Sequence, residues 1–436
     1  MAKSYLKNQQ QLTFDKMMGF LEGKFQSLPD HRASNAQFQL AEVVKSGFAM
    51  FSLKCPSLLN FKDQTEADQS NLRSIYRIKG DIPCDNQMRG ILDPVDASLL
   101  RPLFSACFQR LRQAGILRDY QYWYNYVIVS VDGVEHYSST KVHCPNCLTR
   151  THRNGEVSYH HSALAAVMVH PNQTEVFPLD FEPIVRQDGA KKNDCERNAA
   201  KRLCEQLRER YADLLILLVE DALYANAPHL RQIIDYDWLY VINVKPDSHE
   251  SLFKQFAGRQ ARGQVKELRQ TDEKGVQHYY AWTSDLCLCE SATDVKVNFL
   301  LYQQTAADGQ VKCWTWISNL PLNIRSVDKV MRAGRSRWKI ENETFNTLKN
   351  QGYHFEHNFG HGQQNLATVL ALLMMLAFLV DQIQQRYCPI FRQLRKGIST
   401  KVKLWELMRS LFHVLLFESM EALFRHMASL YRLHLE

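Results

Sequence analysis

Tyr126-Val-Ile-Val-Ser-Val-Asp-Gly133 is a run rich in β-branched residues that closes with an acid and a glycine. It predicts a buried strand that ends at Asp132. Leu214-Leu-Ile-Leu-Leu-Val-Glu-Asp-Ala222 has the same form, so Asp221 also follows a core strand. A lone buried carboxylate is strongly unfavourable unless a cation or hydrogen-bond donors compensate it. Two acids at two strand ends therefore indicate a shared metal ion, although strand-end aspartates are also common as turn formers and helix caps.

A third acid lies in Arg335-Ser-Arg-Trp-Lys-Ile-Glu-Asn-Glu-Thr-Phe-Asn-Thr-Leu-Lys349, which we expect to form one helix. Arg337 and Glu341 are four residues apart and share a face of that helix. Three apolar residues are expected to mark the side that packs inward: Trp338, Phe345 and Leu348. Taken alone, the segment also fits an ordinary amphipathic helix with an Arg/Glu pair. Glu343 competes as third acid, but the four-residue step from Arg337 favours Glu341.

Asp132, Asp221 and the Arg-Trp-x-Ile-Glu segment resemble the catalytic core of DDE transposases of bacterial insertion sequences, in the group with a ribonuclease H-like fold and a YREK motif. The resemblance covers roughly residues 120–380. The separations of 89 and 120 residues between successive acids are compatible with that group, in which a mainly β insertion precedes the Glu. The chain departs from the motif at two positions. Gly334 stands where Tyr is expected, and the expected Lys occurs one residue late, as Lys349.

The resemblance implies metal-dependent cleavage and strand transfer on DNA. Asp132, Asp221 and Glu341 would hold two Mg²⁺ ions, for which Mn²⁺ could substitute, because oxygen ligands suit these cations. Arg337 and Lys349 would bind phosphates near the scissile bond.

By the same resemblance, Trp314 takes the place of an aromatic residue that stacks on a base flipped out of the DNA end. A tryptophan on a strand is also commonly a core residue. The expected partners are double-stranded DNA, both as transposon ends and as target. Because two ends must be cut in concert and one chain carries one triad, we expect a homodimer in the DNA complex.

The expected fold class is mixed α/β: a ribonuclease H-like core with a mainly β insertion, flanked by N- and C-terminal helical regions. The insertion is expected from short alternating stretches such as Val311-Lys-Cys-Trp-Thr-Trp-Ile317. The expected divisions are 1–115, a helical region that binds DNA ends; 116–245, the first part of the core; 246–318, the insertion; 319–385, the rest of the core with the Glu-bearing helix; and 386–436, a helical region.

Cys144-Pro-Asn-Cys147 is a compact chelating turn among several histidines. The histidines close to it in sequence are His136, His143, His152, His160 and His161. These residues offer enough ligands for a tetrahedral structural Zn²⁺ site. A second Cys-x-x-Cys is missing from the sequence, so reduced thiols in a Pro-Asn turn are the alternative.

Composition agrees with a soluble DNA-binding enzyme. The chain has 436 residues, 45% of them hydrophobic, and a net charge of +7 that favours polyanionic partners. The first residues lack an apolar stretch of signal-peptide length, so we expect a cytoplasmic bacterial protein associated with the nucleoid through DNA. The longest apolar stretch, residues 366–380, predicts a core helix, and no membrane partner is expected. A ribonuclease H-like nuclease and a non-catalytic DNA-binding descendant of a transposase remain as alternatives.

Overall fold

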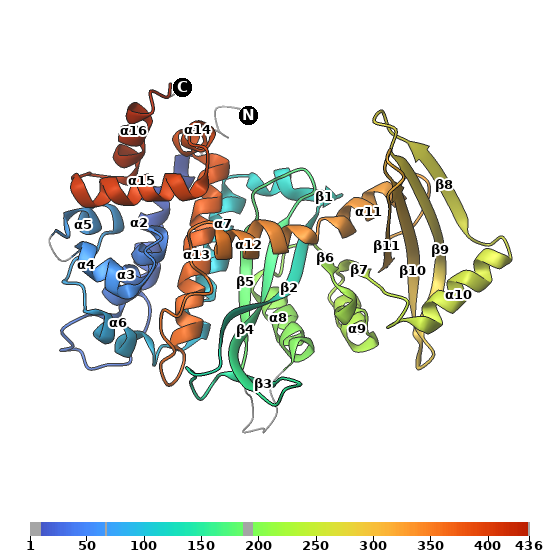
Figure 1. The fold of residues 1–436 in the computed structure, drawn as a ribbon, viewed down its shortest axis with the longest axis horizontal. Coiled ribbons are helices and arrows are strands. Elements are labelled where there is room, and N and C mark those ends of the chain that lie inside the picture. Colours follow the sequence, from blue (N-terminus) through green and yellow to red (C-terminus); the bar gives the residue numbers. More distant parts are fainter. Residues whose placement is uncertain (1–9, 66–67, 186–194, 435–436) are drawn as a thin grey trace.

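The computed structural model describes residues 10–65, 68–185 and 195–434. Figure 1 shows a group of helices at one end of the molecule, a sheet in the middle and an antiparallel sheet at the other end. The C-terminal helices return to the N-terminal ones. The mixed α/β class predicted from the sequence is confirmed.

The N-terminal region is helical. Its elements are η1 (Gln10–Leu12), α2 (Phe14–Gln26), α3 (Leu40–Ser52), α4 (Leu58–Thr65), α5 (Ser70–Tyr76), α6 (Asp85–Leu92), η2 (Ala97–Leu99), α7 (Pro102–Gln113) and η3 (Ile116–Tyr120). α3 is buried almost all round. Its Gly47 allows a close approach to the C-terminal part of the chain, because a Cβ there would lie 2.9 Å from Cδ1 of Leu373.

The core sheet follows. Its strands are β1 (Gln121–Trp123), β2 (Tyr126–Ser139), β3 (Leu148–Thr151), β4 (Val157–Val169), β5 (Phe177–Ile184), β6 (Ile216–Glu220) and β7 (Leu239–Asn243). β4 lies antiparallel between β2 and β5, while β6 and β7 continue parallel on the other side of β2. Three antiparallel strands followed by two parallel ones are consistent with a ribonuclease H-like core. Parallel neighbours need crossovers, and the helices there are α8 (Glu196–Arg210), η4 (Ala222–Tyr224) and α9 (Ala227–Asp235).

An antiparallel unit extends this sheet. Its elements are α10 (Glu250–Ala261), β8 (Lys266–Thr271), β9 (Gln277–Cys289), β10 (Ala292–Thr305) and β11 (Val311–Ser318). β11 pairs with β7, Ile317 opposite Ile242, so the strands of both units form one continuous sheet. The expected mainly β insertion is therefore joined to the core by a hydrogen-bonded ladder rather than by loops alone.

The remaining elements are helical: α11 (Val327–Arg335), the π-helical segment η5 (Ile340–Phe345), α12 (Asn346–Asn350), α13 (Leu366–Tyr387), α14 (Pro389–Gly397), α15 (Lys401–Val414) and α16 (Met420–Leu430). α13 is long and apolar enough to cross a membrane, but 94% of its most apolar window is buried inside the protein. It is the central core helix, as its composition predicts.

A buried ion pair joins the N-terminal helices to this central helix. Lys54, directly after α3, donates to the carboxylate of Asp381 on α13, and both side chains are almost fully buried. The Tyr353 hydroxyl donates to the same carboxylate at 2.6 Å. The Lys54 ammonium also lies 4.1 Å from the ring centroid of Trp405 on α15. Segments far apart in sequence thus meet at one charged centre.

Candidate active site

Asp132 on β2 and Asp221, the residue directly after β6, follow the paired part of two neighbouring parallel strands. β2 and β6 pair in register as far as Ser130 opposite Val219, and both aspartates come two residues later. The expectation that β2 ends at Asp132 is wrong, because the strand continues to Ser139 by pairing with β4 on its other edge. Only the pairing of β2 with β6 ends after Ser130. The two acids therefore lie where the parallel strands separate.

The third acid comes from an interrupted helix rather than the single helix expected. α11 ends at Arg335, Ser336 and Arg337 form a turn, and η5 follows as a π-helix. A π-helix has a wider turn, so the 3.6-residue spacing does not predict its faces. Phe345 and Leu348 are buried as expected, but the expectation that Trp338 packs inward is wrong, since it is 43% exposed.

Arg337 connects the acids. Its Nη1 lies 2.7 Å from Oδ2 of Asp132 and 2.7 Å from Oε1 of Glu341. Burial raises the pKa of Asp132 to about 7; Arg337 opposes that rise, and the charges of Glu341 and Asp221 add to it. The structure therefore brings Asp132 and Glu341 into contact with one guanidinium. Asp221 lies close enough for its charge to act on Arg337, while its carboxylate accepts a hydrogen bond from the Leu223 N–H at 2.8 Å and caps η4. Glu343 interacts electrostatically with Lys339 instead.

A fourth carboxylate, which the sequence did not reveal, approaches the same place. Glu196 lies in the first turn of α8, and a Cβ on Gly133 would come within 2.7 Å of its Oε1. The Tyr224 hydroxyl donates to its Oε2 at 3.4 Å. Burial raises the pKa of Glu196, and the charge of Asp221 adds to the rise. The glycine that follows Asp132 was the available signal, because a glycine often marks a close approach.

The two other predicted DNA-binding residues, Lys349 and Trp314, contact residues outside the acid cluster. Lys349, on α12, pairs with Glu356 at 2.7 Å. Trp314, on β11, is partly buried; its ring stacks on Tyr302 with centroids 5.6 Å apart, and the guanidinium of Arg335 lies 4.7 Å from its centroid. A base stacked on Trp314 would therefore compete with Arg335 for a ring face.

Gly334, where the resemblance predicts Tyr, has no room for a side chain. A Cβ at this position would lie 2.5 Å from Nε1 of Trp316. Trp316 is fully buried and donates to Oδ1 of Asn243 at 3.2 Å, so its indole is held in place. The indole of β11 occupies the space that a side chain on α11 would need.

Gly334→Ala is therefore expected to lower the free energy of unfolding by about 1–3 kcal/mol, the usual cost of overpacking a well-packed core. Chemical denaturation measures it. Gly90→Ala is the matched control, because Gly90 is also helical and a Cβ there meets nothing within 4 Å. This control should be neutral or stabilising by up to about 1 kcal/mol. Equal stability of the two variants would contradict the steric argument.

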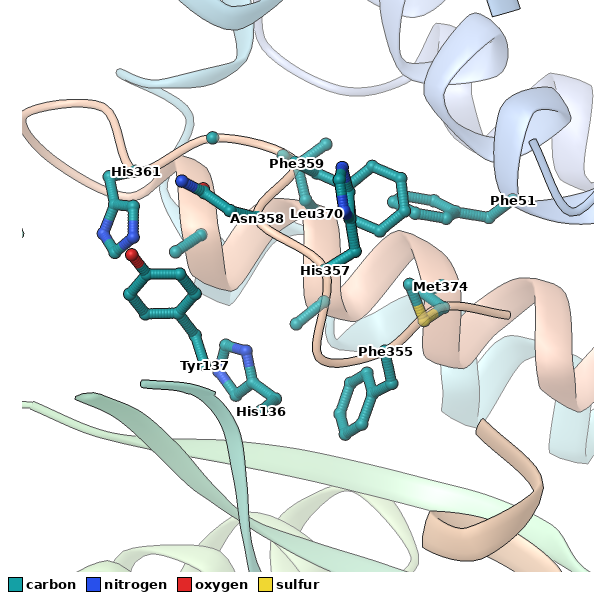
Figure 2. A pocket seen from close by; sticks show the side chains of 13 residues that line it. Phe51, His136, Tyr137, Phe355, His357, Asn358, Phe359, His361, Leu370 and Met374 are labelled. Carbon is teal, nitrogen blue, oxygen red and sulfur yellow. The ribbon is translucent and has the colours of Figure 1, made fainter. Parts of the chain in front are cut away.

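A small cavity lies between β2 and the segment before α13, away from the acids. Its volume is about 30 Å³, room for roughly one water molecule. Figure 2 shows His136, Tyr137, Phe355 and His361 around it. None of the three predicted acids lines this cavity, which is too small for a nucleotide.

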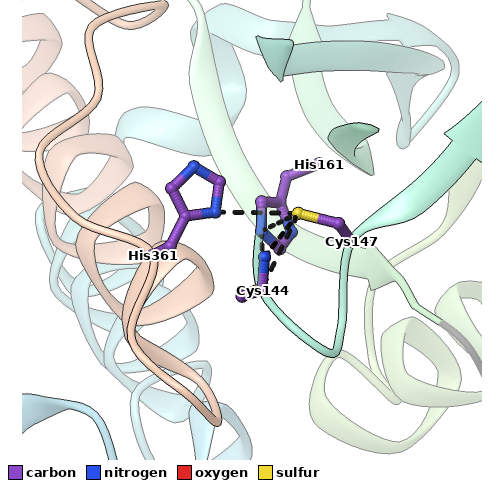
Figure 3. A group of neighbouring side chains, drawn as sticks. All are labelled: Cys144, Cys147, His161 and His361. Carbon is purple, nitrogen blue, oxygen red and sulfur yellow. Dashed lines mark hydrogen bonds between the residues drawn. The ribbon is translucent and has the colours of Figure 1, made fainter. Parts of the chain in front are cut away.

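The predicted cysteines belong to a second cluster. Cys144 and Cys147 meet His161 of β4 and His361 of the loop before α13 (Figure 3). Of the histidines close in sequence only His161 takes part, and the set does not include His136, His143, His152 or His160. His361 was missed because it lies 214 residues beyond Cys147. A hydrogen bond between the two thiols lowers the pKa of Cys144 well below its usual range, burial opposes this, and His161 adds to it.

The carboxylate cluster offers oxygen donors, the ligands that Mg²⁺ prefers. Its donor atoms are more widely spaced than those of a preformed metal site, because among the described residues only Cys144, Cys147, His161 and His361 have donor atoms within 4.8 Å of one another. The raised pKa of Asp132 shows that its negative charge is undercompensated even with Arg337 at 2.7 Å. A bound cation would supply that compensation.

Comparisons with known proteins identify the family. A family model described as the transposase DDE domain matches residues 147–379, more than half of the chain. The match includes Asp221 and Glu341 and begins after Asp132. Among solved structures, a cryo-EM structure of a piggyBac transposase synaptic complex with hairpin DNA is similar, with 11% identity and a TM-score of 0.42 over 97% of this chain and 79% of that chain. No curated protein matches. The chain belongs to the family of transposases with a DDE domain, and the predicted DNA transposase is confirmed at that level.

Proposed function

We propose that this protein is the transposase of a bacterial insertion sequence, of the YREK type, which binds the ends of its element, cleaves them and joins them to target DNA. The observation that supports it most is the convergence of Asp132, Asp221 and Glu341 around Arg337. One acid comes from β2, one follows β6 and one comes from a distant helix. They meet near Arg337, whose guanidinium is suited to binding phosphate.

In this proposal Asp132, Asp221 and Glu341 hold Mg²⁺, or Mn²⁺ in its place. When bound, the cations would activate the attacking hydroxyl or water and stabilise the leaving oxygen. Arg337 balances the acids in this structure and would bind a phosphate at the scissile bond with its planar fork. Lys349 would add a point charge, and Trp314 would stack on a base displaced from the DNA end.

The working unit would contain at least two chains, because each element end needs its own set of acids. We place the protein in the bacterial cytoplasm, on the nucleoid. Light scattering with and without end-sequence DNA tests the assembly. A complex with one chain that still joins both ends would contradict it.

The function is tested with DNA from both flanks of the gene, a target plasmid and Mg²⁺, followed by gel analysis of the products. The proposal expects joined products that disappear when a chelator removes the metal. Cut but unjoined DNA would indicate the nuclease, and binding without cutting would indicate a non-catalytic protein. Either result would overturn the proposal.

Stabilisation by Mg²⁺ should depend on pH through Asp132. Its pKa rises from 3.8 to about 7 in the fold, so the protonated carboxyl stabilises the native state at low pH. That contribution is lost progressively as pH rises from about 4 to about 7, where the carboxyl ionises in a buried place. At a pH below the pKa of Asp132, Mg²⁺ must displace the carboxyl proton in order to bind. At a pH above that pKa, it meets a carboxylate that is already ionised.

We therefore expect Mg²⁺ to raise the melting temperature more at about pH 8 than at about pH 6. Differential scanning fluorimetry at constant ionic strength measures this difference. Asp132→Asn should remove it. An equal effect of Mg²⁺ at both pH values in the unmodified protein would show that Asp132 does not bind the cation.

A further inference from the structure

The Cys and His cluster outside the active site has the form of a closed metal site. Cys144 and Cys147 lie in the turn before β3, His161 on β4 and His361 in the loop between α12 and α13. One donor atom from each residue lies within 4.8 Å of all the others, and all four residues are buried. Figure 3 shows the side chains directed toward a common centre.

The distances between donor atoms match the edges of a tetrahedron around zinc. With Zn–S near 2.3 Å and Zn–N near 2.05 Å, tetrahedral ligands are separated by about 3.8 Å for two sulfurs and about 3.5 Å for sulfur and nitrogen. The two Sγ atoms are 3.6 Å apart. Nε2 of His161 lies 3.3 Å from Sγ of Cys144 and 3.4 Å from Sγ of Cys147, and Nδ1 of His361 lies 3.6 Å from Sγ of Cys147. A disulfide would require about 2.05 Å between the sulfurs.

The surroundings of the cluster also suit a metal. The backbone N–H of Cys144 points to Sγ of Cys147 at 3.3 Å, an interaction that favours a thiolate. Nε2 of His361 is buried without a partner among the described residues. His361 also lines the cavity of about 30 Å³, where one water molecule could accept a hydrogen bond from that nitrogen. A ligand histidine usually donates its second N–H in this way.

We propose that Cys144, Cys147, His161 and His361 bind one structural Zn²⁺ ion. Two thiolates with two imidazoles in tetrahedral arrangement select zinc, and a site closed by four protein ligands leaves no position for a substrate. The ion fastens the loop that follows the Glu341-bearing helix to the turn before β3 and to β4 of the core sheet. This inference does not depend on the catalytic proposal, because its ligands and its tests are separate from the acids.

Elemental analysis of the full-length protein, purified without chelator, tests the site. We expect about one zinc per chain in the unmodified protein and almost none in Cys147→Ser or His361→Ala. His143→Ala is the matched control: His143 is next to Cys144 in sequence but is exposed and outside the cluster, so this variant should keep its zinc. Loss of zinc from His143→Ala with retention in His361→Ala would overturn the assignment.

His361→Ala is expected to remain folded, because the loop has a second anchor. The Asp93 carboxylate accepts hydrogen bonds from the backbone N–H groups of Gln363, Gln364 and Leu366 at 2.8–3.1 Å. If the variants nevertheless fail to fold, Co²⁺ substitution in the unmodified protein tests whether these four residues bind a metal ion. Visible bands of tetrahedral Co²⁺ with a thiolate charge-transfer band would support the site. Folded protein that binds neither zinc nor cobalt with thiolate ligands would overturn it.

Discussion

Asp132→Asn should reduce DNA cleavage by about a thousandfold or more, equivalent to a loss of roughly 4 kcal/mol of transition-state stabilisation. The amide keeps the shape of the side chain but removes the charge that would bind the cation. Asp221→Asn and Glu341→Gln should behave alike, since the three acids meet around Arg337. Single-turnover cleavage of end-sequence DNA measures the effect, with a binding assay alongside it. DNA binding should persist, because the proposal assigns the acids to the metal rather than to phosphate.

Glu343→Gln is the matched control for the third acid. It lies on the same π-helix, two residues from Glu341, but interacts with Lys339 rather than with Arg337. Cleavage by this variant should stay close to normal. An inactive Glu343→Gln beside an active Glu341→Gln would show that the third acid had been misassigned.

Lys54→Met should destabilise the protein by about 3–5 kcal/mol, because it leaves the Asp381 carboxylate buried without its cation. The same substitution removes the ammonium from the ring of Trp405. Chemical denaturation gives the change in the free energy of unfolding. A second substitution, Asp381→Leu, should recover part of the loss, since replacing both members of a buried pair is far less costly than removing one.

Arg425→Ala provides the comparison for an exposed pair. Arg425 and Glu421 are 2.8 Å apart on α16, and both are largely exposed. Losing this exposed ion pair should lower the free energy of unfolding by less than about 1 kcal/mol. If Lys54→Met costs no more than Arg425→Ala, the charged centre does not hold the N-terminal helices to α13.

The core strands and the first two acids were predictable because their signals are local. A β-branched run such as residues 126–133 has few folded alternatives, and an acid at the end of a buried strand is conspicuous. The register that sets Asp132 beside Asp221 follows from parallel pairing of two such runs. What the sequence could not show was the continuation of β2 to Ser139, because that depends on β4, a strand formed elsewhere in the chain.

The missed residues share a physical reason. His361 and Asp381 have their partners in distant segments, and nothing in their neighbouring residues indicates these contacts. Glu196 opens an ordinary amphipathic helix, so only the fold brings it near Gly133. The prediction for Trp338 was wrong because it assumed a regular helical period from Trp338 to Phe345, whereas the π-helical turn between them is wider.

The wide turn of η5 changes the direction in which the later side chains of this helix face. In the YREK group that the sequence resembles, Lys lies seven positions after Glu, whereas Lys349 lies eight positions after Glu341. In an ordinary α-helix one inserted residue would rotate every later side chain by about 100°. A π-helical turn absorbs one residue and leaves the following turns in phase. Since η5 (Ile340–Phe345) is such a turn, Lys349 faces about the direction that the residue one position earlier would face on a regular α-helix.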